Sequence, residues 1–102
     1  MMGYINCDRN HVEDYLLCEV EYEIESSNKK FGEQNHSPAE WLAILGEEFG
    51  EAAKEVVEAS ASKSLINKTT RYKNLRKELI QTACVALKMV QSLDRNELEG
   101  QK

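Results

Sequence analysis

The sequence predicts an all-α protein, a helical bundle of three main helices that is completed by oligomerisation. Apolar residues recur at helical spacing along most of the chain, and one proline and five glycines leave few turn signals. The 102 residues suit a single domain, residues 1–102 with a core of about 9–95, although a domain of this size has a thin core. Long helices would therefore gain from packing against further copies, as a dimer or tetramer.

The first helix is expected to begin near Asp8 or Asn10 and to run to about Lys30, where Phe31-Gly32 ends it. Its apolar stripe repeats every four residues and is broadened by two neighbours. The stripe consists of Val12, Leu16, Val20 and Ile24, with Tyr15 and Leu17 beside it.

The second helix has the clearest start in the sequence and should run from Pro38 to about Ser60. Ser37 is the expected N-cap, Pro38 takes the first helical position, and Glu40 closes a capping box. The apolar face of this helix consists of Leu42, Leu45, Phe49, Ala52, Ala53 and Val56.

A polar connector is expected from Ser60 to Thr70, with Leu65-Ile66 packed down inside it. The third helix should start between Thr69 and Tyr72 and end near Leu93 or Asp94, and residues 97–102 should form a frayed tail. Its apolar side consists of Tyr72, Leu75, Leu79, Ala83, Ala86, Leu87 and Val90.

The charge balance and the cysteines limit the partner and the compartment. The net charge is −5, and basic residues gather only in the short stretch 68–77, so we expect no nucleic-acid partner. The longest uncharged run, residues 79–87, is too short to span a bilayer, so no membrane is expected either. Three cysteines without C-x-x-C spacing fit a reduced compartment, and we expect a cytoplasmic protein in which Cys84 acts as a small hydrophobe.

The second helix carries a stripe of glutamates within an arc of about 100°. A solvated side of an amphipathic helix is one interpretation, because most of the stripe lies opposite the apolar face. The members of the stripe are Glu47, Glu48, Glu51, Glu55 and Glu58.

Glu78 on the third helix gives this stripe a second interpretation, because it is a lone carboxylate just before nine uncharged residues. A carboxylate on such a side persists when it is paired or coordinates a metal, and the facing stripe would supply more oxygens for Mg²⁺. The alternative is an ion pair between Glu78 and Arg71, or partial exposure near the helix start.

Two runs of sequence carry a family resemblance: W-L-A-I-L-G-E-E-F-G-E at residues 41–51 and R-K-E-L-I-Q at residues 76–81. They resemble the MazG-like branch of the all-α nucleoside triphosphate pyrophosphohydrolases, which has E-E-x-x-E on one helix and E-x-x-D on the next. The resemblance covers residues 31–95. It implies Mg²⁺-dependent cleavage of nucleoside or deoxynucleoside triphosphates to the monophosphate and pyrophosphate, with Mn²⁺ as a possible substitute.

Carried over by position, the resemblance implies a metal site of Glu48, Glu51, Glu78 and Gln81, with Glu47 and Glu51 as catalytic residues. Gln81 departs from the family pattern, which has aspartate there. An amide oxygen can coordinate a metal but brings no negative charge, which should weaken Mg²⁺ binding.

The resemblance also implies a mechanism in which Mg²⁺ bridges carboxylates and phosphates and activates a water molecule. A glutamate that is not a ligand, Glu47 or Glu55, would accept the proton.

Four residues are candidates for substrate binding, each with a plainer alternative. Lys54 and Arg76 can neutralise phosphate oxygens, or can instead pair with glutamates one turn away. Trp41 can stack on a base, or can instead pack at the core edge. His36 can contact a sugar or base, or can instead shape the loop before the capping box.

Two other classes of function stay open. A MazG-like helical module for interaction or nucleotide binding, without the chemistry, is favoured by the exchange at Gln81. An interaction protein of unrelated ancestry, whose acidic helix binds a basic partner, would bind in a salt-sensitive way and would not respond to Mg²⁺.

Overall fold

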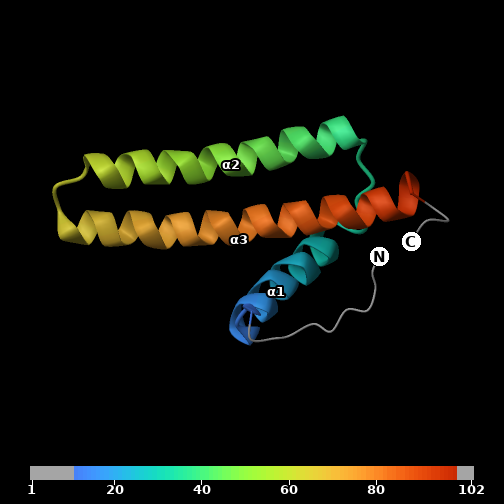
Figure 1. Ribbon diagram of the computed structural model, residues 1–102, viewed down its shortest axis with the longest axis horizontal. Coiled ribbons are helices and arrows are strands. Elements are labelled where there is room, and N and C mark those ends of the chain that lie inside the picture. The colour runs from blue at the N-terminus through green and yellow to red at the C-terminus, as the bar shows by residue number, and fades with distance from the viewer. Residues whose placement is uncertain (1–10, 99–102) are drawn as a thin grey trace.

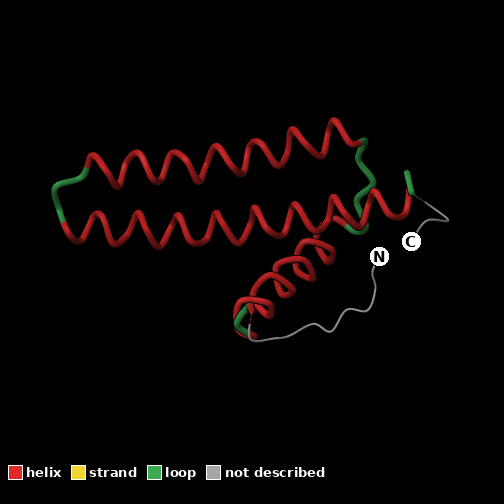
Figure 2. The backbone as a smooth tube through the Cα atoms, viewed as in Figure 1, coloured by secondary structure: helices red, strands yellow, loops and turns green. Residues whose placement is uncertain are grey.

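The computed structural model describes residues 11–98, which form three α-helices: α1 (Asp14–Phe31), α2 (Pro38–Ala61) and α3 (Leu65–Asn96). α2 and α3 lie side by side and antiparallel over most of their length, and α1 packs obliquely against α3 (Figure 1). Only short loops separate the helices (Figure 2). The all-helical class is confirmed, since no strand occurs in residues 11–98.

α1 ends for a local reason, the glycine at position 32. The expected start near Asp8 or Asn10 lies outside the described residues, and the described helix begins at Asp14. The predicted end is confirmed: Gly32 has φ 71°, which favours glycine, and its N–H donates to the Asn28 carbonyl oxygen at 2.8 Å.

α2 starts with the predicted capping box. The Glu40 backbone N–H donates to Ser37 Oγ at 3.2 Å, and the Ser37 N–H donates to Glu40 Oε1 at 2.8 Å. The hydrogen bond from the Ser37 backbone lowers the pKa of the Glu40 carboxyl. Pro38 occupies the first turn, so all three expected features of this helix start are confirmed.

The connector between α2 and α3 is much shorter than expected. The prediction of a polar segment from Ser60 to Thr70 is wrong, because α2 continues to Ala61 and α3 begins at Leu65. Ser64 acts as an N-cap, its side chain accepting a hydrogen bond from the Asn67 N–H at 3.3 Å. Leu65 and Ile66 are not packed down: they are 78% and 81% exposed.

α2 meets α3 through small, aromatic and acidic side chains. Trp41, Ala52 and Ala59 are buried there, and Glu48 and Glu55 are half-buried on the same helix. Glu48 lies one turn before Ala52 and Glu55 one turn before Ala59, so both glutamates share the side of α2 that holds the buried alanines. The interpretation of the stripe as simply the solvated side of the helix is therefore wrong for Glu48 and Glu55.

The predicted apolar faces of α2 and α3 remain largely uncovered. Leu42 and Phe49 on α2 are 62% and 69% exposed, and Leu79 and Leu87 on α3 are also exposed. The buried residues of α3 are instead Cys84, Lys88 and Ser92. The radius of gyration is 16.4 Å, which is larger than the value of about 13 Å expected for a compact domain of this length.

None of the helices in residues 11–98 combines the length and apolarity needed to cross a bilayer.

Candidate functional site

Three of the predicted glutamates, Glu47, Glu51 and Glu78, lie within electrostatic range of the fourth, Glu48 of α2. Glu48 is half-buried, and the pKa of its carboxyl is raised first by burial and then by the negative charges of Glu78, Glu51 and Glu47. The structure thus places Glu78 of α3 close enough to Glu48 of α2 to repel it electrostatically. This is the juxtaposition that the antiparallel arrangement predicts.

The remaining glutamates of the stripe have a counter-charge. Arg71 of α3 donates to Glu55 at 3.2 Å and lies 2.8 Å from Glu58. The expected alternative of an Arg71–Glu78 pair is therefore wrong, because Arg71 reaches across to α2 instead. Because Glu55 is held in this pair, it is a poor candidate for a base.

The other four glutamates near the α2–α3 contact have no basic partner within residues 11–98. Within residues 11–98, no ion pair is formed by the side chains of Glu47, Glu48, Glu51 or Glu78. Like charges at this spacing repel when nothing neutralises them. We therefore define these four residues as the acidic site.

The side chains of the acidic site are suitable ligands for Mg²⁺, but they are not arranged as a preformed metal site. Carboxylate oxygens are the donors that Mg²⁺ prefers. In the described part of the chain, however, no three acidic, histidine or cysteine side chains are grouped closely enough to hold a metal. Rotations of the long glutamate side chains would be required to bring their oxygens together.

Gln81, the one predicted metal ligand without a carboxylate, is hydrogen-bonded to a carboxylate of α1. Its Nε2 donates to Glu23 Oε2 at 2.8 Å. Glu23 therefore places a negative charge beside the residue that lacks one. Nothing in the sequence singles out Glu23, because the pattern of α1 does not indicate which of its sides meets α3.

Cys84 of α3 is buried near charged side chains from all three helices. Burial raises the pKa of its thiol; Lys88 lowers it, and Glu23 and Glu48 raise it further. One side chain from each helix, Glu23, Glu48 and Lys88, is therefore within electrostatic reach of the Cys84 sulfur. The expectation that Cys84 behaves as a small buried hydrophobe is confirmed, since it is 3% exposed.

Trp41 and His36 pack against each other beside the start of α2. The ring centroids are 4.8 Å apart at 78°, an edge-to-face contact. Trp41 is 2% exposed, and its Nε1–H has no hydrogen-bond partner among the described residues. This arrangement favours the packing alternative for both residues, and stacking of Trp41 on a base would require the indole to be uncovered.

The candidate phosphate-binding residues differ in availability. Arg76 makes a two-pronged ion pair with Glu19 of α1, with distances of 2.7 and 2.6 Å. This hydrogen-bonded pair raises the pKa of Arg76 and lowers that of Glu19. Lys54 is exposed and forms no ion pair within residues 11–98. Lys54 is therefore freer than Arg76 to meet a phosphate.

Comparisons with known proteins add no relative: no family model, no curated protein and no solved structure matches this chain.

Proposed function

We propose that the protein is a Mg²⁺-dependent pyrophosphohydrolase, which converts nucleoside or deoxynucleoside triphosphates to the monophosphate and pyrophosphate. The supporting observation is the acidic site, in which Glu48 is half-buried among three like charges and no basic side chain of the described chain neutralises them. Such crowding is costly in an apoprotein, and a bound cation relieves it. The sequence resemblance supplies the reaction.

The chain's own residues would share the work as follows. Glu48, Glu51 and Glu78 would hold the ion, with the Gln81 amide oxygen as a neutral fourth donor. Bound Mg²⁺ would supply the positive charge that offsets both the carboxylates and the triphosphate. Glu47 is exposed at the edge of the site and would accept the proton of the attacking water.

We also propose that the functional form is a homo-oligomer, a dimer or a tetramer. The predicted apolar faces of α2 and α3 lie largely outside the contact between these two helices. Four of their residues, Leu42, Phe49, Leu79 and Leu87, are exposed. Leu42 and Phe49 are seven residues apart and therefore lie on one side of α2, and an exposed apolar helix face is typical of an interface. The free thiols of Cys18 and Cys84 are in keeping with a reduced, cytoplasmic location.

A non-catalytic module for interaction or nucleotide binding is the second candidate. It is favoured by Gln81, which is neutral and already bonded to Glu23. A module of this kind would bind a nucleotide or a partner without releasing pyrophosphate.

Pyrophosphate release from a panel of nucleoside and deoxynucleoside triphosphates, with Mg²⁺ or Mn²⁺, separates the two candidates. The native chain is compared with Glu51→Gln and Glu78→Gln, and with the exposed control Glu25→Gln on α1. Turnover that both site variants lose and the control keeps would support the enzyme. No turnover by the native chain, together with nucleotide binding that does not respond to metal, would support the module.

A further inference from the structure

A polar pocket of about 450 Å³ lies at the other end of the α1–α3 contact, beyond the acidic site. It is bounded by α1, the loop after it and the last turns of α3, and every lining side chain is polar or charged. The lining residues are Asn28, Glu33, Gln34, Lys88, Gln91, Asp94 and Arg95. A volume of this size is typical of small-molecule sites.

Lys88 is the unusual member of this lining, because it is only 6% exposed. Its Nζ donates to Ser27 Oγ and to Gln34 Oε1, the second at 2.5 Å. Both acceptors are neutral, and no ion pair of Lys88 is formed within residues 11–98. Lysine is almost never buried to this degree without a partner of opposite charge.

The ammonium group of Lys88 has one hydrogen-bond donor left for a negatively charged partner. An ammonium group has three N–H donors, and two of them are used on Ser27 and Gln34. Burial lowers the pKa of Lys88, which is the effect expected when a cation lacks a counter-charge. Lys88 is one of the lining residues, so a ligand in the pocket can accept the third hydrogen bond and offset the charge.

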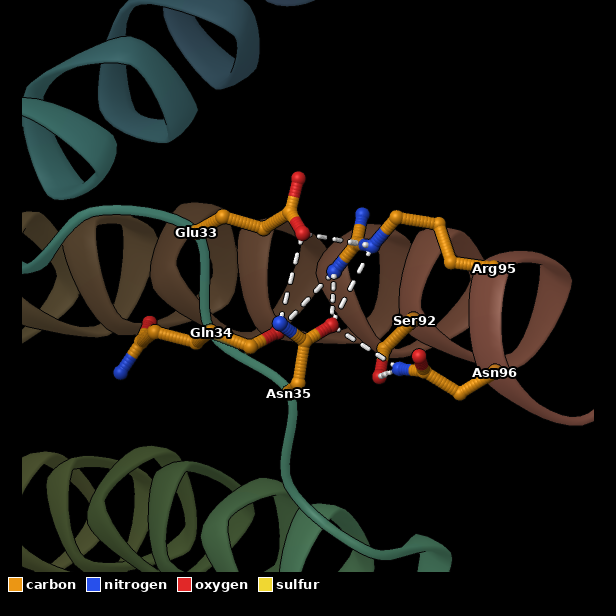
Figure 3. Close-up of polar contacts among 6 residues, drawn as sticks. All are labelled: Glu33, Gln34, Asn35, Ser92, Arg95 and Asn96. Atoms are coloured by element: carbon orange, nitrogen blue, oxygen red, sulfur yellow. Dashed lines mark hydrogen bonds and ion pairs between the residues drawn. The ribbon is translucent and has the colours of Figure 1, made fainter.

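Arg95 holds the loop between α1 and α2 against α3, and this loop carries Gln34, which contacts Lys88. Arg95 Nη2 donates to the Gln34 carbonyl oxygen and to Asn35 Oδ1, each at 3.0 Å, and Arg95 Nε lies 3.3 Å from Glu33 Oε2. Figure 3 shows the loop residues fastened to the end of α3 by these contacts. Because Gln34 is fixed by its backbone, its side chain can fix Lys88.

We propose that this pocket binds a small anionic molecule, whose carboxylate or phosphate oxygen accepts the third hydrogen bond from Lys88 Nζ. The charge of Glu33 is shared with Arg95, which leaves Asp94 as the lining carboxylate that forms no ion pair within residues 11–98. The body of the ligand should therefore carry hydrogen-bond donors that meet Asp94 and the amides of Asn28 and Gln91. This proposal does not depend on the proposed enzyme activity.

The test is a titration of the isotope-labelled full chain, followed by amide and lysine resonances in NMR, with inorganic phosphate and L-glutamate as probes of the two anion classes. We expect saturable shifts at Lys88, Gln34 and Gln91 with at least one probe. Lys88→Met should weaken that binding by about ten- to a hundredfold, because a hydrogen bond to a charged group is lost.

Two variants keep the test decisive. Lys73→Met makes the same change at an exposed position of α3 and should bind as the native chain does. Gln91→Glu offers Lys88 a carboxylate of the chain itself, at an exposed position that tolerates the change, and should also weaken the binding. Saturable binding of either probe tells which anion class the pocket prefers. The proposal is overturned if neither probe gives saturable shifts, or if Lys88→Met and Lys73→Met behave alike.

Discussion

Replacing Glu48 by glutamine should stabilise the metal-free protein and remove its response to Mg²⁺. Glutamine keeps the size of the side chain and removes the charge that burial and three neighbouring glutamates disfavour. The pKa of Glu48 is raised above 4.5 in the folded chain, so its favourable contribution to stability is present below pH 4.5 and is lost as the pH rises through the folded-state value. The gain from Glu48→Gln should therefore appear at neutral pH and vanish in acid.

The size of this gain follows from charge removal at a partly exposed site. Each unit of pKa shift corresponds to about 1.4 kcal/mol, but solvent screening at a half-buried side chain reduces the effect. We expect about 0.5–1 kcal/mol, which for a domain of this length is a rise in Tm of about 2–8 °C. In contrast, Mg²⁺ at a hundred times its Kd should stabilise the native chain by about 2.7 kcal/mol and the variant far less.

Thermal unfolding followed by circular dichroism, with EDTA or with increasing Mg²⁺, measures both effects. Protein concentration is held constant, because Tm depends on it in an oligomer. The exposed control Glu25→Gln should change neither Tm nor the Mg²⁺ response. The reasoning is refuted if Glu48→Gln is less stable than the native chain in EDTA at neutral pH, or if Mg²⁺ stabilises both equally.

Four further predictions concern other parts of the structure. Trp41→Ala should cost about 3–5 kcal/mol in chemical denaturation, and Trp41→Phe only about 1–2 kcal/mol because it also removes the unbonded Nε1–H; equal losses would contradict the buried packing role. Lys88→Met should be more stable than the native chain below the lowered folded-state pKa of Lys88, and pH-dependent melts should show this advantage shrinking as the pH rises toward 10.5; an advantage independent of pH would exclude the buried charge as its cause. Phe49→Lys should reduce the assembly seen in sedimentation, whereas the exposed α1 change Tyr22→Lys should not; unchanged assembly would exclude this face as the interface. Arg76→Ala should speed amide exchange in α1 and spare α2, so an increase shared by all three helices would argue against Arg76 as the anchor of α1.

The features that could be predicted from the sequence are local ones. The capping box at Ser37 and the glycine stop at Gly32 depend only on residues within a turn, so their outcome follows from short-range chemistry. The second loop follows the same short-range chemistry, because Ser64 in its serine-rich stretch caps α3; the prediction of a long connector there is wrong.

The face by which each helix packs was harder to predict. Periodicity identifies an apolar face but not the element that covers it. Of the predicted face of α2, Ala52 is buried but Leu42 and Phe49 stay exposed, and Trp41 and Ala59 are buried although they were not part of that face. The neighbourhood of Glu48 and Glu78 could be predicted, because two antiparallel helices bring facing positions together. The places of Glu23 and Lys88 could not, since they depend on how α1 docks.

The docking of α1 has a consequence for access to both sites. No residue of α1 is buried, and its polar contacts with α3 run through Glu19, Glu23 and Ser27. The ion pair between Glu19 and Arg76 weakens with salt, and a helix held by a few polar contacts has little independent stability. If α1 moves away from α3, the carboxylate beside Gln81 and an acceptor of Lys88 leave together. Movement of α1 would therefore change the surroundings of the acidic site and of the proposed anion pocket at the same time.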